Sequence, residues 1–412
     1  MALAWAQKHA EQEGRNLAMT ALLGTVGCSV IQNHLEQSSN SVDVKPAYAR
    51  AHWREIPREN WETGSQAVWD ETVRSKQPLI LTDSKIVDWR RYNSYSGGVL
   101  ETSMAGRDVF VKMSPNARFR PWNLRDDNQL FYQKGYEYDP PCKTVKMKYE
   151  EFLEIQKRNE TDVPPPGNKK PWTEQRVYLQ HEIEGLDCFL MQDAQTWNWE
   201  WLMRNVACHG WGLPKDSKLW IGSKGSETPL HFDQSENVYV QLRGRKRVIL
   251  FPAIDYLKLY LFPVGHPCDR HCMVNVPCNN DELFPLFASA QGFYTVLNPG
   301  DCLYIPYGWF HYFCNEDSGS ASLNFWSQKA EPKPTLVGGK LVLDDEHVVL
   351  VYRNLERMCV NTMVQIGYKP HEMMPRFVAA LRKPNSDDAE SEHVISQLIT
   401  LLNCTNKPPE QH

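Results

Sequence analysis

Short runs rich in apolar, β-branched and aromatic residues dominate the chain between about residues 176 and 330. Turns that contain glycine or proline separate the runs, which read VYLQHEI, KLWIGS, PLHFD, NVYVQLRG, KRVILF, GFYTVLN, CLYIP, WFHYFC and ASLNFWS. Runs of this composition are typical of strands, and many short strands joined by such turns indicate a sandwich or a small barrel. We therefore predict a mainly β core over residues 176–330.

Helical spacing of apolar residues appears on both sides of this core. It occurs in QAVWDETVRSK and YEEFLEIQKRN, and a short buried strand, PLILTD, lies between them. The second helix and the proline-rich run TDVPPPGNKKPW that follows it are interpreted as an insertion. We divide the chain into a loosely ordered extension (1–50), an α/β flank with the insertion (51–175), the core (176–330) and a C-terminal helical region (331–412). The C-terminal helices would form a homodimer or pack on their own core.

Composition narrows the class of protein. The 412 residues carry a net charge of −5, which gives no general reason to expect nucleic-acid binding. Eleven cysteines, an odd number, indicate reduced thiols in the cytoplasm and/or nucleus rather than a disulfide framework. The uncharged run NLAMTALLGTVGCSVIQN is too short and too polar to span a bilayer, and a targeting role is the weaker interpretation. We expect no membrane attachment.

Three residues could hold a metal ion. His231 and Asp233 stand two apart in PLHFD, so both side chains point to one face of a strand. That pair alone is weak, because polar residues at this spacing often face water. His311 lies in the aromatic run WFHYFC, where a buried imidazole is either a hydrogen-bonded core residue or a third ligand. Two histidines and one carboxylate are typical of non-haem Fe(II) oxygenases, which keep positions open for a 2-oxo acid and O2. A zinc ion with these ligands and a water is the alternative.

Lys246 follows the turn at Gly244 and begins the next predicted strand. A 2-oxoglutarate co-substrate needs a cation for its far carboxylate, and a lysine ammonium suits that role. Alone, Lys246 would be interpreted as a charge that protects a strand edge, as we interpret Arg243, Arg245 and Arg247. Together with the three metal ligands, it is predicted to bind the co-substrate.

These residues, in this order and with the turn Pro299-Gly300-Asp301, resemble the JmjC-type 2-oxoglutarate oxygenases, in particular their asparaginyl hydroxylase subgroup. The motifs that carry the resemblance are TPLHFDQSENVYVQLRGRKRVILFP, PVGHPCDR, FPLF, YTVLNPGDCLYIPYGWFHY and LNFWS, and it covers roughly residues 75–365. It implies a double-stranded β-helix (jelly-roll, cupin-type) core with flanking helices. It also implies Fe(II), 2-oxoglutarate and O2, an oxygen-sensing hydroxylase that releases succinate and CO2, and dimerisation through the C-terminal helices. The implied target is the β-carbon of asparagine in an extended peptide, such as hypoxia-inducible factor, or in an ankyrin-repeat protein.

The resemblance also assigns site residues. It implies His231, Asp233 and His311 as the catalytic metal ligands. Co-substrate binding is implied for Lys246, Tyr178, Thr228, Asn237 and Asn324. Contact with the target side chain is implied for Gln180, Arg270, His271 and Trp326. Without the resemblance, we would interpret most of these aromatic, hydroxyl and amide residues as core, turn or strand-end residues.

Three features differ from the asparaginyl hydroxylase subgroup and leave the target open. His271 replaces a glutamine, Gln234 replaces the usual glutamate after the aspartate ligand, and RFRPWN stands where a tyrosine-rich loop is expected. The alternatives are another protein side chain, methyl-lysine in histones and a modified tRNA base. A cupin-like protein that binds without catalysis is the rival from another class.

A cluster of cysteines and histidines could hold a second metal ion. The segment GHPCDRHCMVNVPC contains His266, Cys268, His271, Cys272 and Cys278, but its spacing fits no common zinc finger. A structural zinc is therefore the weaker interpretation.

Overall fold

The computed structural model describes residues 53–94, 98–114, 117–120, 142–161, 176–183, 190–262, 268–274, 276, 285–329, 335–337, 340–342, 349–350, 353–354 and 357. The predicted extension 1–50 and the proline-rich loop fall outside these residues. So do most of the predicted C-terminal helices.

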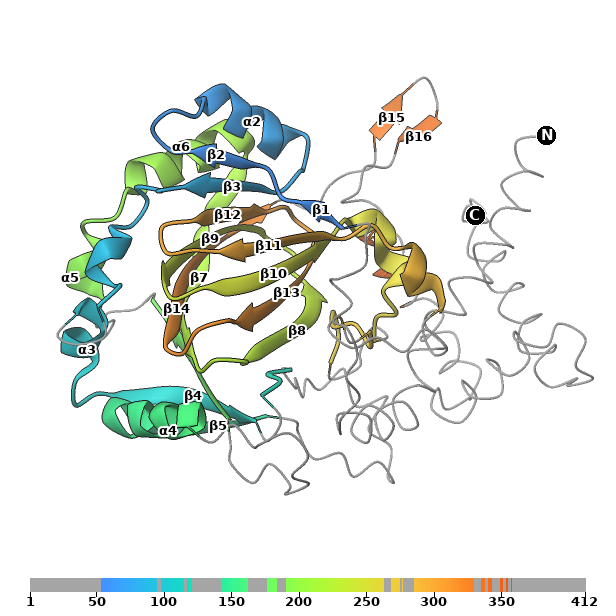
Figure 1. Cartoon of the computed structure of the whole chain (residues 1–412). Coiled ribbons are helices and arrows are strands. Elements are labelled where there is room, and N and C mark those ends of the chain that lie inside the picture. Colours follow the sequence, from blue (N-terminus) through green and yellow to red (C-terminus); the bar gives the residue numbers. More distant parts are fainter. Residues whose placement is uncertain are drawn as a thin grey trace, which may run out of the picture.

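Two sheets form the core (Figure 1). The five-stranded sheet has the order β1 (Arg54–Glu55), β11 (Phe293–Leu297), β10 (Lys246–Phe251), β13 (Phe310–Asn315) and β8 (Glu227–Phe232). The nine-stranded sheet has the order β2 (Arg58–Asn60), β3 (Leu79–Thr82), β12 (Cys302–Ile305), β9 (Glu236–Arg243), β14 (Ser320–Lys329), β7 (Trp211–Gly222), β6 (Arg176–Glu182), β4 (Asp108–Ser114) and β5 (Lys143–Lys148). A separate hairpin joins β15 (Thr335–Val337) to β16 (Lys340–Val342).

Strands β7 to β14 are divided between the two sheets and build the jelly-roll. Within this set, β8, β13, β10 and β11 pair antiparallel in one sheet, and β7, β14, β9 and β12 do so in the other. An apolar cluster with members from both sheets fills the space between them, including Tyr239, Leu303, Val248 and Phe313. The fold is therefore the predicted mainly β jelly-roll with flanking helices.

Strands from the flank extend these sheets. The parallel strand β2 and the antiparallel strand β12 both pair with β3, while β4 joins β6 to β5 at the far edge. The helix predicted in the insertion is α4 (Tyr149–Thr161), and its Phe152 lies in the largest apolar cluster among the described residues. The segment 143–161 is thus an integral part of the packed core.

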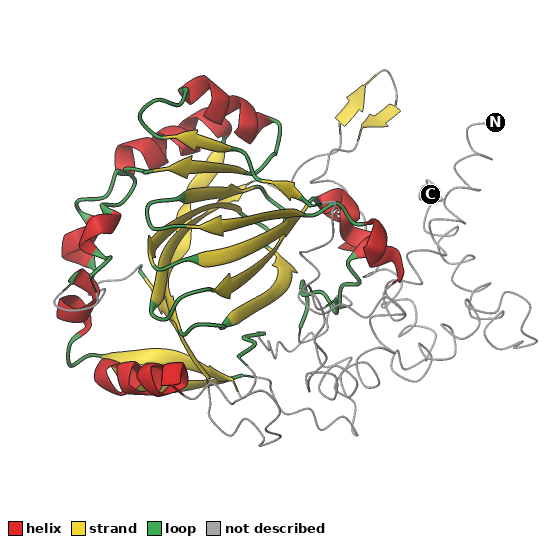
Figure 2. Ribbon diagram, viewed as in Figure 1, coloured by secondary structure: helices red, strands yellow, loops and turns green. Residues whose placement is uncertain are grey.

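Helices cover the outer face of the nine-stranded sheet (Figure 2). They are α2 (Gln66–Arg74), α3 (Val99–Met104), α4, α5 (Met191–Ala194) and α6 (Trp199–His209). Their apolar side chains pack on Val240 and Leu323 of the sheet, as Trp69 and Leu202 do. The outer face of the five-stranded sheet is covered by chain that includes the short helices η4 (Ala253–Lys258) and η5 (Pro285–Ser289), while η2 (Trp89–Arg91) lies between β3 and α3. No helix in the described part of the chain is long and apolar enough to cross a membrane.

Strand β10 is a central strand, so the arginines near it do not protect a strand edge, contrary to our interpretation of the sequence. It lies between β11 and β13, and Arg243 at the end of β9 is only 1% exposed. The Arg243 guanidinium donates to Glu101 at 2.7 Å and to the carbonyl of Gly319 at 2.9 Å. Arg245 is exposed and paired with Asp317, and Arg247 is half-buried and paired with Glu316. Because β9 and β10 are both paired on two sides, none of the three arginines protects a strand edge.

Candidate functional site

The three predicted metal ligands meet between the two sheets. Leu230 and Phe232 of β8 pack against the chain that covers the outer face of the five-stranded sheet. His231 and the following Asp233 therefore point inward. His311 lies directly opposite His231 in the β8–β13 ladder, and the two ring centroids are 4.1 Å apart. The candidate ligand atoms of all three residues lie within 4.8 Å of one another.

Backbone hydrogen bonds fix the orientation of both imidazoles. His231 Nδ1 lies 2.9 Å from the carbonyl oxygen of Pro229, and His311 Nδ1 lies 3.1 Å from that of Trp309. Because a carbonyl can only accept, each Nδ1 carries the proton and each Nε2 presents a lone pair. Burial and the neighbouring His311 lower the pKa of His231 to about 3, which keeps it neutral. Such a second bond to the imidazole is typical of metal-ligating histidines.

Asp233 provides a carboxylate that is not fully satisfied by the protein. Burial opposes its ionisation, but the contact with His311 and the neighbouring His231 and Arg270 hold its pKa below the usual range. Its Oδ2 is buried without a hydrogen-bond partner in the described structure and lies 3.5 Å from His311 Nε2. A buried orphan oxygen facing two imidazole lone pairs fits a divalent cation. The residues present therefore fit Fe(II), and among the described residues no other group of metal ligands was found.

Lys246 is fully buried and has hydroxyl groups as its polar neighbours. Its Nζ donates to the Tyr239 hydroxyl at 2.6 Å and to Ser322 Oγ at 2.9 Å, and the Tyr178 hydroxyl lies 3.5 Å away. No acidic side chain in the described part of the chain forms an ion pair with it. Burial lowers the pKa of Lys246 to about 7. Burial of an amino group with hydroxyls as its polar partners and no described carboxylate nearby fits a site that binds an anionic ligand.

Tyr239 and Ser322 were missed by the sequence analysis. Tyr239 stands two residues after Asn237 on β9, and Ser322 stands two before Asn324 on β14. Residues two apart on a strand share a face, so the assignment of Asn237 and Asn324 to the site could have led to both hydroxyls.

Thr228 reaches the same side of its strand through a β-bulge. His231 pairs with His311 and Thr228 with Phe313, so β8 has one more residue than β13 between these pairs. Thr228, three residues before His231, thereby points inward and hydrogen-bonds Tyr178, whose pKa is raised by burial. Pro229 occupies the bulge, where its missing N–H costs no ladder bond.

The other predicted co-substrate residues line the same interior. Asn237 Oδ1 and Asn324 Nδ2 are buried without partners in the described structure. Asn324 accepts a hydrogen bond from Trp220 at 2.6 Å, and Trp220 contacts Trp326 edge to face. Gln180 pairs with Trp220 across β6 and β7. Trp220 therefore lies beside Asn324, which is predicted to bind the co-substrate, and beside Trp326 and Gln180, which are predicted to contact the target.

Arg270 and His271 lie on a chain segment that pairs antiparallel with β8, with His271 opposite His231. Nη1 of Arg270 lies 3.5 Å from Asp233 Oδ1, and His271 stacks on His231 at 4.8 Å. His271 is 3% exposed, its Nδ1 has no partner in the described structure, and burial keeps its pKa well below the usual value. Both residues therefore stand beside the ligand set. In the proposed zinc cluster, His266 and Cys278 lie outside the described residues, so that hypothesis stays a prediction.

Comparisons with known proteins agree with this geometry. Residues 65–331 match the family of cupin-like domains. The chain is 32% identical to human HSPB1-associated protein 1 over 273 residues, which are 61% of this chain and 51% of that protein. It is 35% identical to Jumonji C domain-containing protein 5 of Drosophila melanogaster over 116 residues, 27% of each chain. It is 36% identical to tRNA wybutosine-synthesizing protein 5 of Gallus gallus over 106 residues, 26% of this chain and 32% of that protein.

The match thus spans about half of the human relative's length. The family match covers most of this chain and contains all the metal ligands and Lys246. The chain belongs to the cupin-like domain family, among relatives that are named as JmjC-domain proteins.

Proposed function

We propose that this protein is an Fe(II)- and 2-oxoglutarate-dependent oxygenase. The observation that carries the proposal is Lys246, a buried ammonium without a carboxylate partner among the described residues, in the same interior as the His-Asp-His group. Bound Fe(II), with 2-oxoglutarate and O2, would supply the oxidation of an unactivated C–H bond, with release of succinate and CO2. His231, Asp233 and His311 would hold the ion.

The protein's own part is to bind and orient the co-substrate. Lys246, with the hydroxyls of Tyr178, Tyr239 and Ser322 around it, would bind the far carboxylate through charge-assisted hydrogen bonds. The unpaired amide atoms of Asn237 and Asn324 would receive polar atoms at the other end. Holding the reactants in one geometry lowers the entropic part of the barrier.

For the target, we propose the β-carbon of a protein asparagine in an extended peptide or an ankyrin-repeat protein. Gln180, Arg270, His271 and Trp326 would contact it. We also propose a cytoplasmic or nuclear location and a homodimer formed by the C-terminal helices. A tRNA base is the second candidate, since one relative is named as a tRNA wybutosine-synthesizing protein.

Two experiments test the proposal. Anaerobic addition of Fe(II) and 2-oxoglutarate is expected to produce a visible charge-transfer band in the wild-type protein and none in His311→Ala. A wild-type protein without the band would favour a binding protein without catalysis. Mass spectrometry of peptides and tRNA incubated with enzyme, Fe(II), ascorbate and 2-oxoglutarate then identifies the target. A gain of one oxygen on asparagine supports the primary target, a gain on a tRNA base supports the second, and loss of methyl groups from lysine would replace both with a demethylase.

A further inference from the structure

Arg353 lies beyond the part of the chain that matches the cupin-like family, yet it is packed against the metal-ligand strand. This helical residue is 6% exposed. Its guanidinium donates from Nη1 to Asp269 Oδ1 and from Nη2 to Asp269 Oδ2, both at 2.8 Å. Its Cζ also lies 5.5 Å from the ring centroid of Phe232, the residue between the ligands His231 and Asp233. A bidentate pair of this kind has a defined geometry as well as a favourable energy.

Asp269, which is held in place by Arg353, also bonds the backbone of Arg270. Its Oδ1 also accepts the backbone N–H of Arg270 at 2.7 Å. Arg270 has a φ of +68°, a conformation that costs a non-glycine residue energy and persists where surrounding contacts hold it. From this conformation the Arg270 carbonyl accepts the N–H of Phe232 at 3.2 Å, while the guanidinium reaches Asp233. Without the carboxylate, the strained turn would lose one of the bonds that hold it.

A second contact from the same segment reaches the other side of Asp233. Val349, four residues before Arg353 and fully buried, packs next to Gly308, where an added Cβ would lie 3.3 Å from Val349 Cγ2. The N–H of Gly308 donates to the carbonyl of Asp233 at 3.0 Å. Residues four apart on a helix share one face, so this face supports both backbone bonds beside the carboxylate ligand.

We propose that Arg353 is a positioning residue for the candidate metal centre: through Asp269 and Phe232 it fixes Arg270 and the Asp233 carboxylate. The inference rests on the proposed function, because it concerns the same ligand set. It adds that residues beyond the family match are needed for full metal affinity. Changes in the residues that orient metal ligands typically weaken metal binding about 10–100-fold.

The test measures Mn(II) binding to the purified full chain by the loss of the free-ion electron paramagnetic resonance signal. Mn(II) takes the same nitrogen and oxygen donors and does not oxidise during the titration. Arg353→Gln is expected to raise the Kd for Mn(II) about 10-fold, and Arg353→Lys to raise it by less, since lysine keeps the charge without the fork. Arg357→Gln is the matched control, because Arg357 is exposed and bonds Asn354 on its own helix. Its Kd should equal that of the wild type.

The readout separates positioning from a merely structural role. Loss of folded protein lowers the number of sites but leaves the Kd of the folded fraction unchanged, whereas misplacement of Asp233 raises the Kd. If Arg353→Gln does not fold, Arg353→Lys carries the test. Wild-type Kd in the folded variants would overturn the inference, while failure of the wild type to bind Mn(II) would count against the proposed function itself.

Discussion

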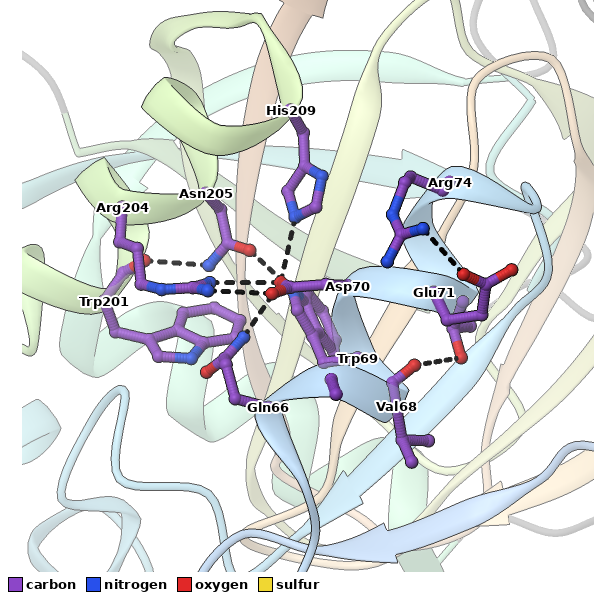
Figure 3. Close-up of polar contacts among 12 residues, drawn as sticks. Gln66, Val68, Trp69, Asp70, Glu71, Arg74, Trp201, Arg204, Asn205 and His209 are labelled. Atoms are coloured by element: carbon purple, nitrogen blue, oxygen red, sulfur yellow. Dashed lines mark hydrogen bonds and ion pairs between the residues drawn. The ribbon is translucent and has the colours of Figure 1, made fainter.

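The clusters around Asp70 and Lys246 differ in how their charged group is neutralised: Asp70 has a cationic partner, whereas Lys246 has no carboxylate partner in the described structure. Figure 3 shows Asp70 of α2 at the α2–α6 contact, where it accepts two hydrogen bonds from Arg204, at 2.8 and 3.1 Å, and one from Gln66, with His209 3.3 Å away. The hydrogen bond from Arg204 outweighs desolvation and lowers the pKa of Asp70 to about 2. Lys246, in contrast, is deeper in the protein and has hydroxyls in place of a carboxylate.

The difference separates a structural cluster from a binding site. At Asp70 the carboxylate and the Arg204 guanidinium neutralise each other, and the pair connects α2 to α6. At Lys246 burial without an opposite charge lowers the pKa to about 7, which is a cost to the free protein. Proteins keep such costs where a ligand removes them. The comparison predicts that changes at Lys246 alter ligand binding and that changes at Asp70 alter stability.

The largest expected effect is on co-substrate binding by Lys246→Met. Hydrogen bonds to charged groups contribute about 1.5–3 kcal/mol, so the Kd for 2-oxoglutarate should rise about 10–100-fold. Calorimetric titration with the metal-loaded protein measures this change. The midpoint of urea unfolding of the metal-free variant should not fall, because the apolar side chain replaces a buried ammonium that has no carboxylate partner in the described structure. A large loss of stability with unchanged binding would reverse the comparison.

A smaller effect is expected from pH. Free Lys246 loses its proton above a pKa of about 7, and a bound carboxylate raises that pKa, so binding above pH 7 takes up a proton. The Kd for 2-oxoglutarate should therefore rise as pH rises from 7 to 8.5, by at most about tenfold per unit. Calorimetry in two buffers of different ionisation enthalpy measures the uptake. The side chain of Lys246→Arg stays charged over this range, so the Kd of this variant for 2-oxoglutarate should depend less on pH, whatever its absolute value. A pH-independent wild type would contradict the assignment.

The smallest effect is expected at the paired cluster. Asp70→Asn should lower the free energy of unfolding by about 1 kcal/mol at pH 7, since the pair is partly exposed. The pKa of Asp70 is about 2 in the folded protein against an ordinary 3.8, so its contribution is present above pH 4 and is lost as pH falls toward 2. Urea unfolding at pH 7 and pH 3 should show the difference between variant and wild type shrinking. The Kd for 2-oxoglutarate should stay unchanged.

Much of the core was predictable because its strands are short apolar and aromatic runs that Gly- and Pro-containing turns separate. Each of the nine runs predicted as strands contains or overlaps a strand of the structure, from β6 to β14. The spacing of two residues also placed His231 and Asp233 on one face of a strand, and the two side chains meet in the structure. The hairpin β4–β5 was not predicted, since its exposed lysines hide the buried positions Val109 and Val111. Helix α6 was also missed, although Asn198 caps it through the N–H of Trp201.

Other features depend on contacts that a linear pattern does not contain. The position of Lys246 relative to Ser322 arises from pairing between distant strands, and Arg243 is buried because Glu101 lies beside it. Alternation along β8 would place Thr228 on the outer face, whereas the bulge at Pro229 reverses this. Tertiary pairing decided these cases over local sequence.

The extra residue at Pro229 sets the phase between the two halves of β8. Without this residue, Thr228 and His231 would stand two apart in a regular strand and would still share the inner face. With the residue kept but the bulge straightened into regular pairing, the two side chains would point to opposite faces, and the co-substrate site would lose a hydroxyl while the metal ligands stayed together. The common orientation of the two binding groups therefore depends on the irregular backbone at Pro229, so a variant that lacks Pro229 should keep both groups on one face.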